Sequence, residues 1–230
     1  MKISGVDKAV VLLKPKRDIY TPKGRIIYLR NDEIITGNEE VIEASKITNA
    51  YIPFAWLSHK IPDASEKLED YVRRGFKGLK LHPVLGHHSL LDSRLEPLLD
   101  KAAHLKIPIM IHTGWRPKGS VKDVGKLAEI YPDAKFINAH MKEDWGVNPR
   151  KSHIKVALEH DNIWLETSYS EHRRRIAEAV DVLGSDRIVF GSDHPYGNIS
   201  EEMNKIRFAP ISERDKVKIL GENALELLNL

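Results

Sequence analysis

Short apolar runs alternate with stretches of helical periodicity along most of the chain. The apolar runs lie at residues 9–13, 50–57, 76–81, 107–112, 135–140, 163–167 and 187–193. Apolar residues at helical spacing lie at 68–72, 95–103, 121–128 and 176–183. Continuous apolar runs are typical of parallel strands that are covered on both faces. Strand and helix alternating at steps of about 25–30 residues therefore predict an α/β fold with seven parallel strands joined by helices.

One segment interrupts this alternation. Residues 14–38 are mostly polar and contain the sequence Thr21-Pro22-Lys23-Gly24. The segment is too long for an ordinary βα loop. We predict an insertion after the first strand, with a small hairpin over one end of the sheet. No linker divides the rest, so residues 1–230 are expected to form one domain.

Composition and charge exclude several classes of protein. Hydrophobic residues make up 41% and charged residues 30%, and 36 basic against 33 acidic residues give a net charge of +3. This balance does not indicate a nucleic-acid partner, and the basic run 173–175 is typical of a solvated helix start. The absence of cysteine excludes disulfides and thiolate metal sites and suits the cytoplasm. The apolar runs are far shorter than the roughly 20 residues that span a bilayer, and the charged start 1–7 is not expected to be a signal peptide.

Polar residues stand where the predicted strands end. His112, His140 and Asp193 each follow an apolar run. Lys80 and His82 lie two residues apart and therefore share one face of a strand. In a parallel sheet the carboxyl ends of all strands lie on one side, and in a barrel that side carries the active site. We expect these five side chains to converge at one mouth.

Imidazole and carboxylate groups at one mouth indicate a divalent metal site. Both bind Zn²⁺, Mn²⁺, Fe²⁺ or Ni²⁺. A single strand-end histidine is more often a satisfied polar residue, and Lys80 can extend to solvent from the rim. The loop residues His87 and His88 are expected to be solvated. Trp115 and Arg116, in the loop after His112, could grip a flat or anionic substrate, although packing at the surface explains them equally well.

Several segments together resemble one family. They are 5–11, Gly78-Leu79-Lys80-Leu81-His82-Pro83, Ile111-His112-Thr113-Gly114, Asn138-Ala139-His140, Phe190-Gly191-Ser192-Asp193-His194-Pro195 and the closing 219–224. The set resembles the amidohydrolase superfamily, and most closely the amidohydrolase-related branch, amidohydrolase family 2. The resemblance implies a (β/α)8 TIM-barrel fold with one or two divalent metals at its mouth. Members hydrolyse amides, lactones, esters or phosphoesters, and some decarboxylate aromatic acids.

The resemblance also implies roles for single residues. His112, His140 and Asp193 correspond to metal ligands, with zinc as the expected ion. His140 can instead activate water or polarise the substrate in relatives with one metal. Asp193 also moves the proton from the attacking water to the leaving group. Lys80 corresponds to a lysine that is carbamylated in some relatives, but it can equally contact the substrate.

The first strand of the family, which ends in His-x-His, has no counterpart here. Seven of eight strands are therefore identifiable, and strand 1 is missing. The favoured explanation is that Met1 is an internal methionine of a longer reading frame. A partner chain or the insertion could fill the gap instead, or the protein could be a degenerate relative. The expected consequence is an incomplete site that binds metal weakly.

The predicted function is a metal-dependent hydrolase whose activated water attacks an amide, lactone or ester carbonyl. Asp193 would act as general base and then acid, and His140 would stabilise the oxyanion. Lys80, His82, Trp115 and Arg116 are the predicted substrate-binding residues. The alternatives are a non-oxidative decarboxylase of the same family and a non-catalytic binding barrel. The expected partner is a small-molecule substrate, without nucleic acid or membrane, and a homo-oligomer is left open.

Overall fold

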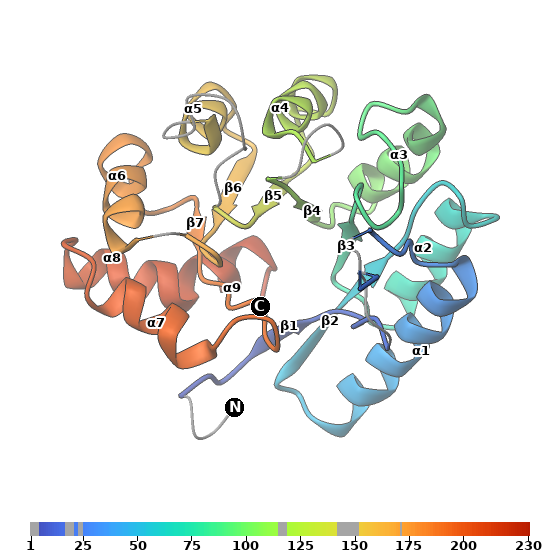
Figure 1. Ribbon diagram of the computed structural model, residues 1–230, viewed down its shortest axis with the longest axis horizontal. Helices are drawn as coiled ribbons and strands as arrows, with labels where there is room; N and C mark the ends of the chain where they lie inside the picture. Colours follow the sequence, from blue (N-terminus) through green and yellow to red (C-terminus); the bar gives the residue numbers. More distant parts are fainter. Residues whose placement is uncertain (1–4, 17–20, 23–24, 115–118, 142–151, 171) are drawn as a thin grey trace.

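In the residues that the structure describes, seven parallel strands curl into an open barrel that helices surround (Figure 1). The computed structural model describes residues 5–16, 21–22, 25–114, 119–141, 152–170 and 172–230. The strands are β1 (Ala9–Val11), β2 (Tyr51–Trp56), β3 (Gly78–Leu81), β4 (Ile109–His112), β5 (Phe136–Ala139), β6 (Ile163–Glu166) and β7 (Ile188–Val189). They pair in chain order, and each pair is parallel. The predicted α/β barrel with seven strands is confirmed.

Helices cover the outside of the strands. They are α1 (Asn31–Ile47), α2 (Ala64–Arg73), α3 (Glu96–His104), α4 (Val121–Ile130), α5 (Ser152–Glu159), α6 (Arg173–Leu183), α7 (Ile199–Arg207), α8 (Glu213–Val217) and α9 (Asn223–Leu227), with the short turns η2 (Ser93–Leu95) and η4 (Lys218–Glu222). In the part of the chain that the structure describes, no helix is long and apolar enough to cross a bilayer.

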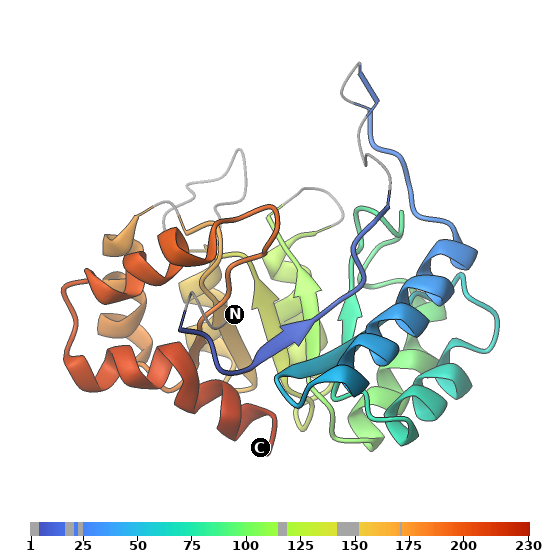
Figure 2. The same ribbon diagram turned by 90° about the horizontal axis from the view of Figure 1, so that it is seen from below.

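The segment between β1 and α1 differs from the predicted insertion at its carboxyl end. Helix α1 begins at Asn31, so residues 31–38 are helical rather than part of an insertion. The described residues before α1 project from the body of the molecule (Figure 2). Within this segment the Thr21 N–H donates to the Arg25 carbonyl at 2.8 Å.

Alternating strand residues build two apolar layers. Residues that point outward, among them Ile109 and Phe136, pack against the helices. Residues that point inward, among them Phe54 and Ile137, meet Leu227 at the end of α9. Because a strand presents successive side chains to opposite faces, both layers come from the same continuous apolar runs.

The barrel remains open between its first and last strands. The described residues of β1 and β7 do not pair with each other. Beyond β7, the Phe190 N–H donates to the Ile219 carbonyl at 2.9 Å. The carboxyl end of the chain lies near this opening in Figure 1, and Asn223 of α9 donates to the carbonyls of Ser185 and Ile188, both at 2.7 Å. The last helices are therefore hydrogen-bonded to β7, the strand that borders the opening.

A buried amide on α1 holds the end of β2. Asn38 is fully buried; its Nδ2 donates to the Trp56 carbonyl at 2.9 Å, and its Oδ1 accepts the Trp56 N–H at 3.0 Å. One side chain thus satisfies both backbone groups of Trp56, which would be costly to leave unpaired in the interior. The Trp56 side chain is thereby held at the strand end.

The two loop histidines differ in exposure. His87 is exposed as expected, but the expectation of a solvated His88 is wrong, because this side chain is buried. Its Nδ1 lies 3.1 Å from the Ser89 carbonyl, and its ring meets the His59 ring edge-on at 5.3 Å. Burial lowers the pKa of His88 to about 4 because the imidazolium form would lose its hydration.

Acid should destabilise the fold through His88. The ordinary histidine pKa of 6.5 applies to the unfolded chain, whereas the folded pKa is about 4. The unfolded state therefore binds more protons between these values, and the free energy of unfolding decreases as pH falls from 6.5 to 4. The decrease is at most about 3 kcal/mol, since one pKa unit corresponds to roughly 1.4 kcal/mol. We expect His88→Asn to flatten the pH dependence of urea unfolding in this window.

The matched control is His104→Asn, which replaces an exposed histidine on α3. It should leave the pH dependence of unfolding as in the wild type. Equal pH dependence in His88→Asn and in the wild type would contradict the assignment.

Candidate active site

Three histidine rings contact one another at the strand ends. The His82 and His112 rings are stacked, with centroids 3.8 Å apart and an angle of 13°. The His140 ring meets His112 edge-on at 4.7 Å, and its Nε2 lies 3.0 Å from Nδ1 of His112. Three predicted site residues from β3, β4 and β5 are therefore brought together.

Trp56 completes the stack on the side of β2. Its ring lies parallel to the His82 ring at 5.1 Å and 8°. Because β2, β3 and β4 are neighbours in that order, Trp56 and His112 cover opposite faces of His82. The Nδ1 atom of His82 also accepts the Leu85 N–H at 3.2 Å. Burial, together with the nearby Lys80, holds the pKa of His82 well below its usual range.

A buried carboxylate supports His140. Glu166, the last residue of β6, is 6% exposed, and its Oε2 accepts the His140 N–H at 2.9 Å. Its Oε1 accepts the Ser168 N–H at 2.8 Å, and its Oε2 also accepts the Ser168 hydroxyl at 2.8 Å. The Ser168 Oγ lies 2.8 Å from Nδ1 of His140. Glu166 and Ser168 therefore connect the ends of β5 and β6.

Glu166 and Ser168 were not among the predicted site residues. The sequence did carry a signal for Glu166: it is a carboxylate near the end of the apolar run 163–167, just as His112 and His140 stand at the ends of their apolar runs. Burial raises the pKa of Glu166, while the hydrogen bonds from His140 and Ser168 oppose that change. Gly191 faces this carboxylate, and a Cβ at that position would lie 1.6 Å from Oε1 of Glu166. The glycine leaves the space that Glu166 occupies.

Asp193 and Lys80 supply opposite charges at the same mouth. Burial raises the pKa of Asp193, while the Lys80 ammonium and a hydrogen bond from Tyr169 oppose that change. Burial lowers the pKa of Lys80 to about 8, against the effect of Asp193 and Glu166. Lys80 is 4% exposed, so it does not extend to solvent from the rim. Tyr169, which also meets His140 edge-on at 5.4 Å, was not predicted.

Three site residues have an unusual backbone conformation. His140, Tyr169 and Asp193 have φ angles of 70°, 56° and 47°. Positive φ is uncommon for residues other than glycine and costs free energy. It turns the chain sharply at the end of the strand, and these three residues carry polar groups of the site. Such conformations cluster at functional sites, which supports the assignment of this mouth as the active site.

The metal prediction concerns His112, His140 and Asp193. Among the residues that the structure describes, no group of three histidine, aspartate or glutamate side chains is arranged to hold a metal ion. The shared metal ion stays a prediction. The predicted substrate contacts Trp115 and Arg116 lie outside the described residues.

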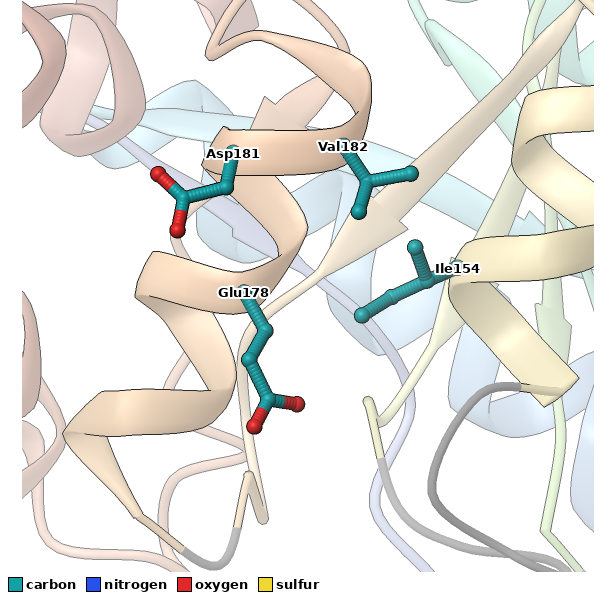
Figure 3. A pocket seen from close by; sticks show the side chains of 4 residues that line it. All are labelled: Ile154, Glu178, Asp181 and Val182. Atoms are coloured by element: carbon teal, nitrogen blue, oxygen red, sulfur yellow. The ribbon is translucent and has the colours of Figure 1, made fainter.

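A separate pocket lies on the outer layer, between α5 and α6 (Figure 3). Its volume is about 220 Å³, and it is lined by Ile154, Glu178, Asp181 and Val182. Glu178 forms an ion pair with Arg175 at 3.2 Å. Because the described lining residues belong to these two helices, we treat the pocket as separate from the strand-end site.

The open barrel and its strand-end site agree with one family. The family model described as Amidohydrolase matches residues 37–230, so this chain belongs to the amidohydrolase family. The γ-resorcylate decarboxylase of Polaromonas sp. (strain JS666) is 30% identical over 120 residues, which are 45% of this chain. The match covers 37% of the length of that relative.

Two solved structures share the fold along nearly the whole chain. The 2,6-dihydroxybenzoate decarboxylase from Rhizobium is 18% identical with a TM-score of 0.76, over 100% of this chain and 86% of that chain. The 5-carboxyvanillate decarboxylase from Novosphingobium aromaticivorans, solved with manganese, is 16% identical with a TM-score of 0.75, over 99% of this chain and 77% of that chain.

These comparisons correct two predictions. The hydrolase prediction is wrong, because the curated relatives that match this chain are decarboxylases. Zinc as the expected ion is also wrong, because two decarboxylases that share this fold were solved with bound manganese. The physical reason is the same in both cases. Imidazole and carboxylate groups bind several divalent ions, so these residue types do not distinguish zinc from manganese. A metal that polarises an oxygen of the substrate can support hydrolysis or decarboxylation, so the same residues do not distinguish the two reactions.

Replacement of Gly191 by alanine tests the position of Glu166. The new Cβ would overlap Oε1, so Glu166 must leave the place where it accepts three hydrogen bonds. We expect Gly191→Ala to lower the free energy of unfolding by about 1–3 kcal/mol, the usual range for overpacking, as measured by urea unfolding.

Gly221→Ala is the matched control, because a Cβ at Gly221 meets nothing within 4 Å. This variant should unfold at the wild-type urea concentration or slightly above it. If the two alanine variants lost equal stability, the close approach of Gly191 to Glu166 would not be the cause.

Proposed function

We propose that this chain carries the active site of a non-oxidative decarboxylase for a hydroxylated aromatic acid. The observation that carries the proposal is the charge interaction between Lys80, which is buried, and Asp193, which is partly buried, at one mouth. Decarboxylation needs a cation that holds the substrate carboxylate and an acid that returns a proton to carbon. The match to γ-resorcylate decarboxylase supports the same reaction class.

Lys80 suits the binding of the substrate carboxylate. With a pKa of about 8, its amine is still mainly an ammonium ion at pH 7. A buried ammonium binds a carboxylate more strongly than an exposed one, because water screens the pair less. His82, Trp115 and Arg116 are proposed as further substrate contacts.

Asp193 suits the proton transfer. Burial raises the pKa of its carboxyl, and in its protonated form this group can deliver a proton to the ring carbon that bears the carboxylate. The bond between that carbon and the carboxylate then breaks, carbon dioxide leaves, and the bonding electrons restore the aromatic ring. Solvent returns the proton to Asp193. Each turnover exchanges one carboxylate for one proton.

The donor chemistry of the site fits a divalent metal. A carboxylate and an imidazole are both ligands for ions such as Mn²⁺, and His112 and Asp193 would hold the ion. When bound, the metal would hold the carboxylate and an adjacent oxygen of the substrate. Both ring nitrogens of His140 have partners in the structure, Ser168 at Nδ1 and His112 at Nε2. The cytoplasmic location and the homo-oligomer stay predictions.

Turnover of 2,6-dihydroxybenzoate by the full chain with Mn²⁺ in D₂O tests the proposal. We expect release of carbon dioxide and one deuterium at the vacated ring carbon, measured by mass spectrometry. Asp193→Asn should lower the rate by at least about 100-fold, the usual contribution of a general acid. The exposed Asp133→Asn is the control and should keep the wild-type rate.

Two outcomes would contradict the proposal. The first is no release of carbon dioxide from 2,6-dihydroxybenzoate or 5-carboxyvanillate. The second is an unchanged rate in Asp193→Asn. Binding of the aromatic acid without release of carbon dioxide would instead favour the non-catalytic binding barrel.

A further inference from the structure

We propose that Glu166 and Ser168 are positioning residues that hold His140 in one neutral tautomer, with its proton on Nδ1. The inference deepens the proposed function, on which it rests only for the role of His140 towards the substrate. Four side chains, one each from the ends of β4 and β5 and two from the end of β6, form the chain of hydrogen bonds that carries it.

The donor and acceptor roles along this chain of hydrogen bonds are fixed first at Glu166. Each of its carboxylate oxygens accepts a backbone N–H, from Ser168 at Oε1 and from His140 at Oε2. Backbone N–H groups can only donate, so they favour the carboxylate as an acceptor. The Ser168 hydroxyl therefore gives its single proton to Oε2, at 2.8 Å. Its oxygen can only accept from the next group.

The next group is the His140 ring. Its Nδ1 lies 2.8 Å from the Ser168 oxygen, so Nδ1 must carry the proton of that hydrogen bond. In a neutral imidazole the other nitrogen then has the lone pair. Nε2 of His140 therefore accepts from Nδ1 of His112, at 3.0 Å. The same rule leaves the lone pair of a neutral His112 on Nε2.

The arrangement is held from several sides. Ser168 and Glu166 are both buried, at 1% and 6% exposure, and Gly191 leaves room for the carboxylate. The partner of one ring nitrogen decides which nitrogen of a histidine is available for a ligand. Glu166 and Ser168 thus determine which nitrogen of His140 carries the proton and which keeps the lone pair.

Long-range ¹H–¹⁵N NMR of the full ¹⁵N-labelled chain tests the proposal without substrate or metal. The His140 signals are those lost in His140→Gln. We expect the wild-type ring to carry its proton on Nδ1. Ser168→Ala should shift the tautomer ratio towards Nε2–H by at least about fivefold, the effect of one hydrogen bond. Ser168→Thr keeps the hydroxyl and should keep the wild-type ratio.

Ser170→Ala is the matched control. Ser170 is also buried, two residues further along, and its Oγ has no hydrogen-bond partner among the described residues. This variant should keep the wild-type tautomer. A wild-type His140 protonated on Nε2, or an unchanged ratio in Ser168→Ala, would overturn the proposal. Intact tautomers without release of carbon dioxide would contradict only the proposed decarboxylase.

Discussion

The buried carboxylate of Glu166 is the interaction on which the site depends. A carboxylate in the interior is costly unless donors replace its lost water, and here three donors do so. The donors come from His140 after β5 and from Ser168 after β6, while Gly191 after β7 leaves the space. One side chain therefore sets the relative positions of three neighbouring strand ends.

The stack of Trp56, His82 and His112 holds the strand ends on the other side of the mouth. Asn38 on α1 holds the backbone of Trp56, whose ring covers His82, and His82 in turn covers His112. Since His112 meets His140, contacts run without interruption from an outer helix to the carboxylate of Glu166. Both faces of His82 are used in this stack, so what remains for a substrate is the edge of its ring.

The strands were predictable because both of their faces are buried, which requires continuous apolar runs.

The start of α1 was not predictable, because the sequence Asn31-Asp32-Glu33 is polar and resembles a loop. Acidic residues are favourable in the first turn of a helix. Ile34 and Val41 are the kind of apolar residue that reaches the core from one helix face only. The burial of His88 was likewise hidden, since a glycine and a second histidine precede it.

The amino-acid sequence by itself determined the alternation of strands and helices, the open barrel, and the polar residues His112, His140, Lys80 and Asp193 at one mouth. These features follow from local periodicity and from the rule that parallel strands end on one side. Only the tertiary structure decided the partners of those residues. Along the chain, 26 residues separate His140 from Glu166 and 25 separate Glu166 from Gly191, and their contact depends on how β5, β6 and β7 pair.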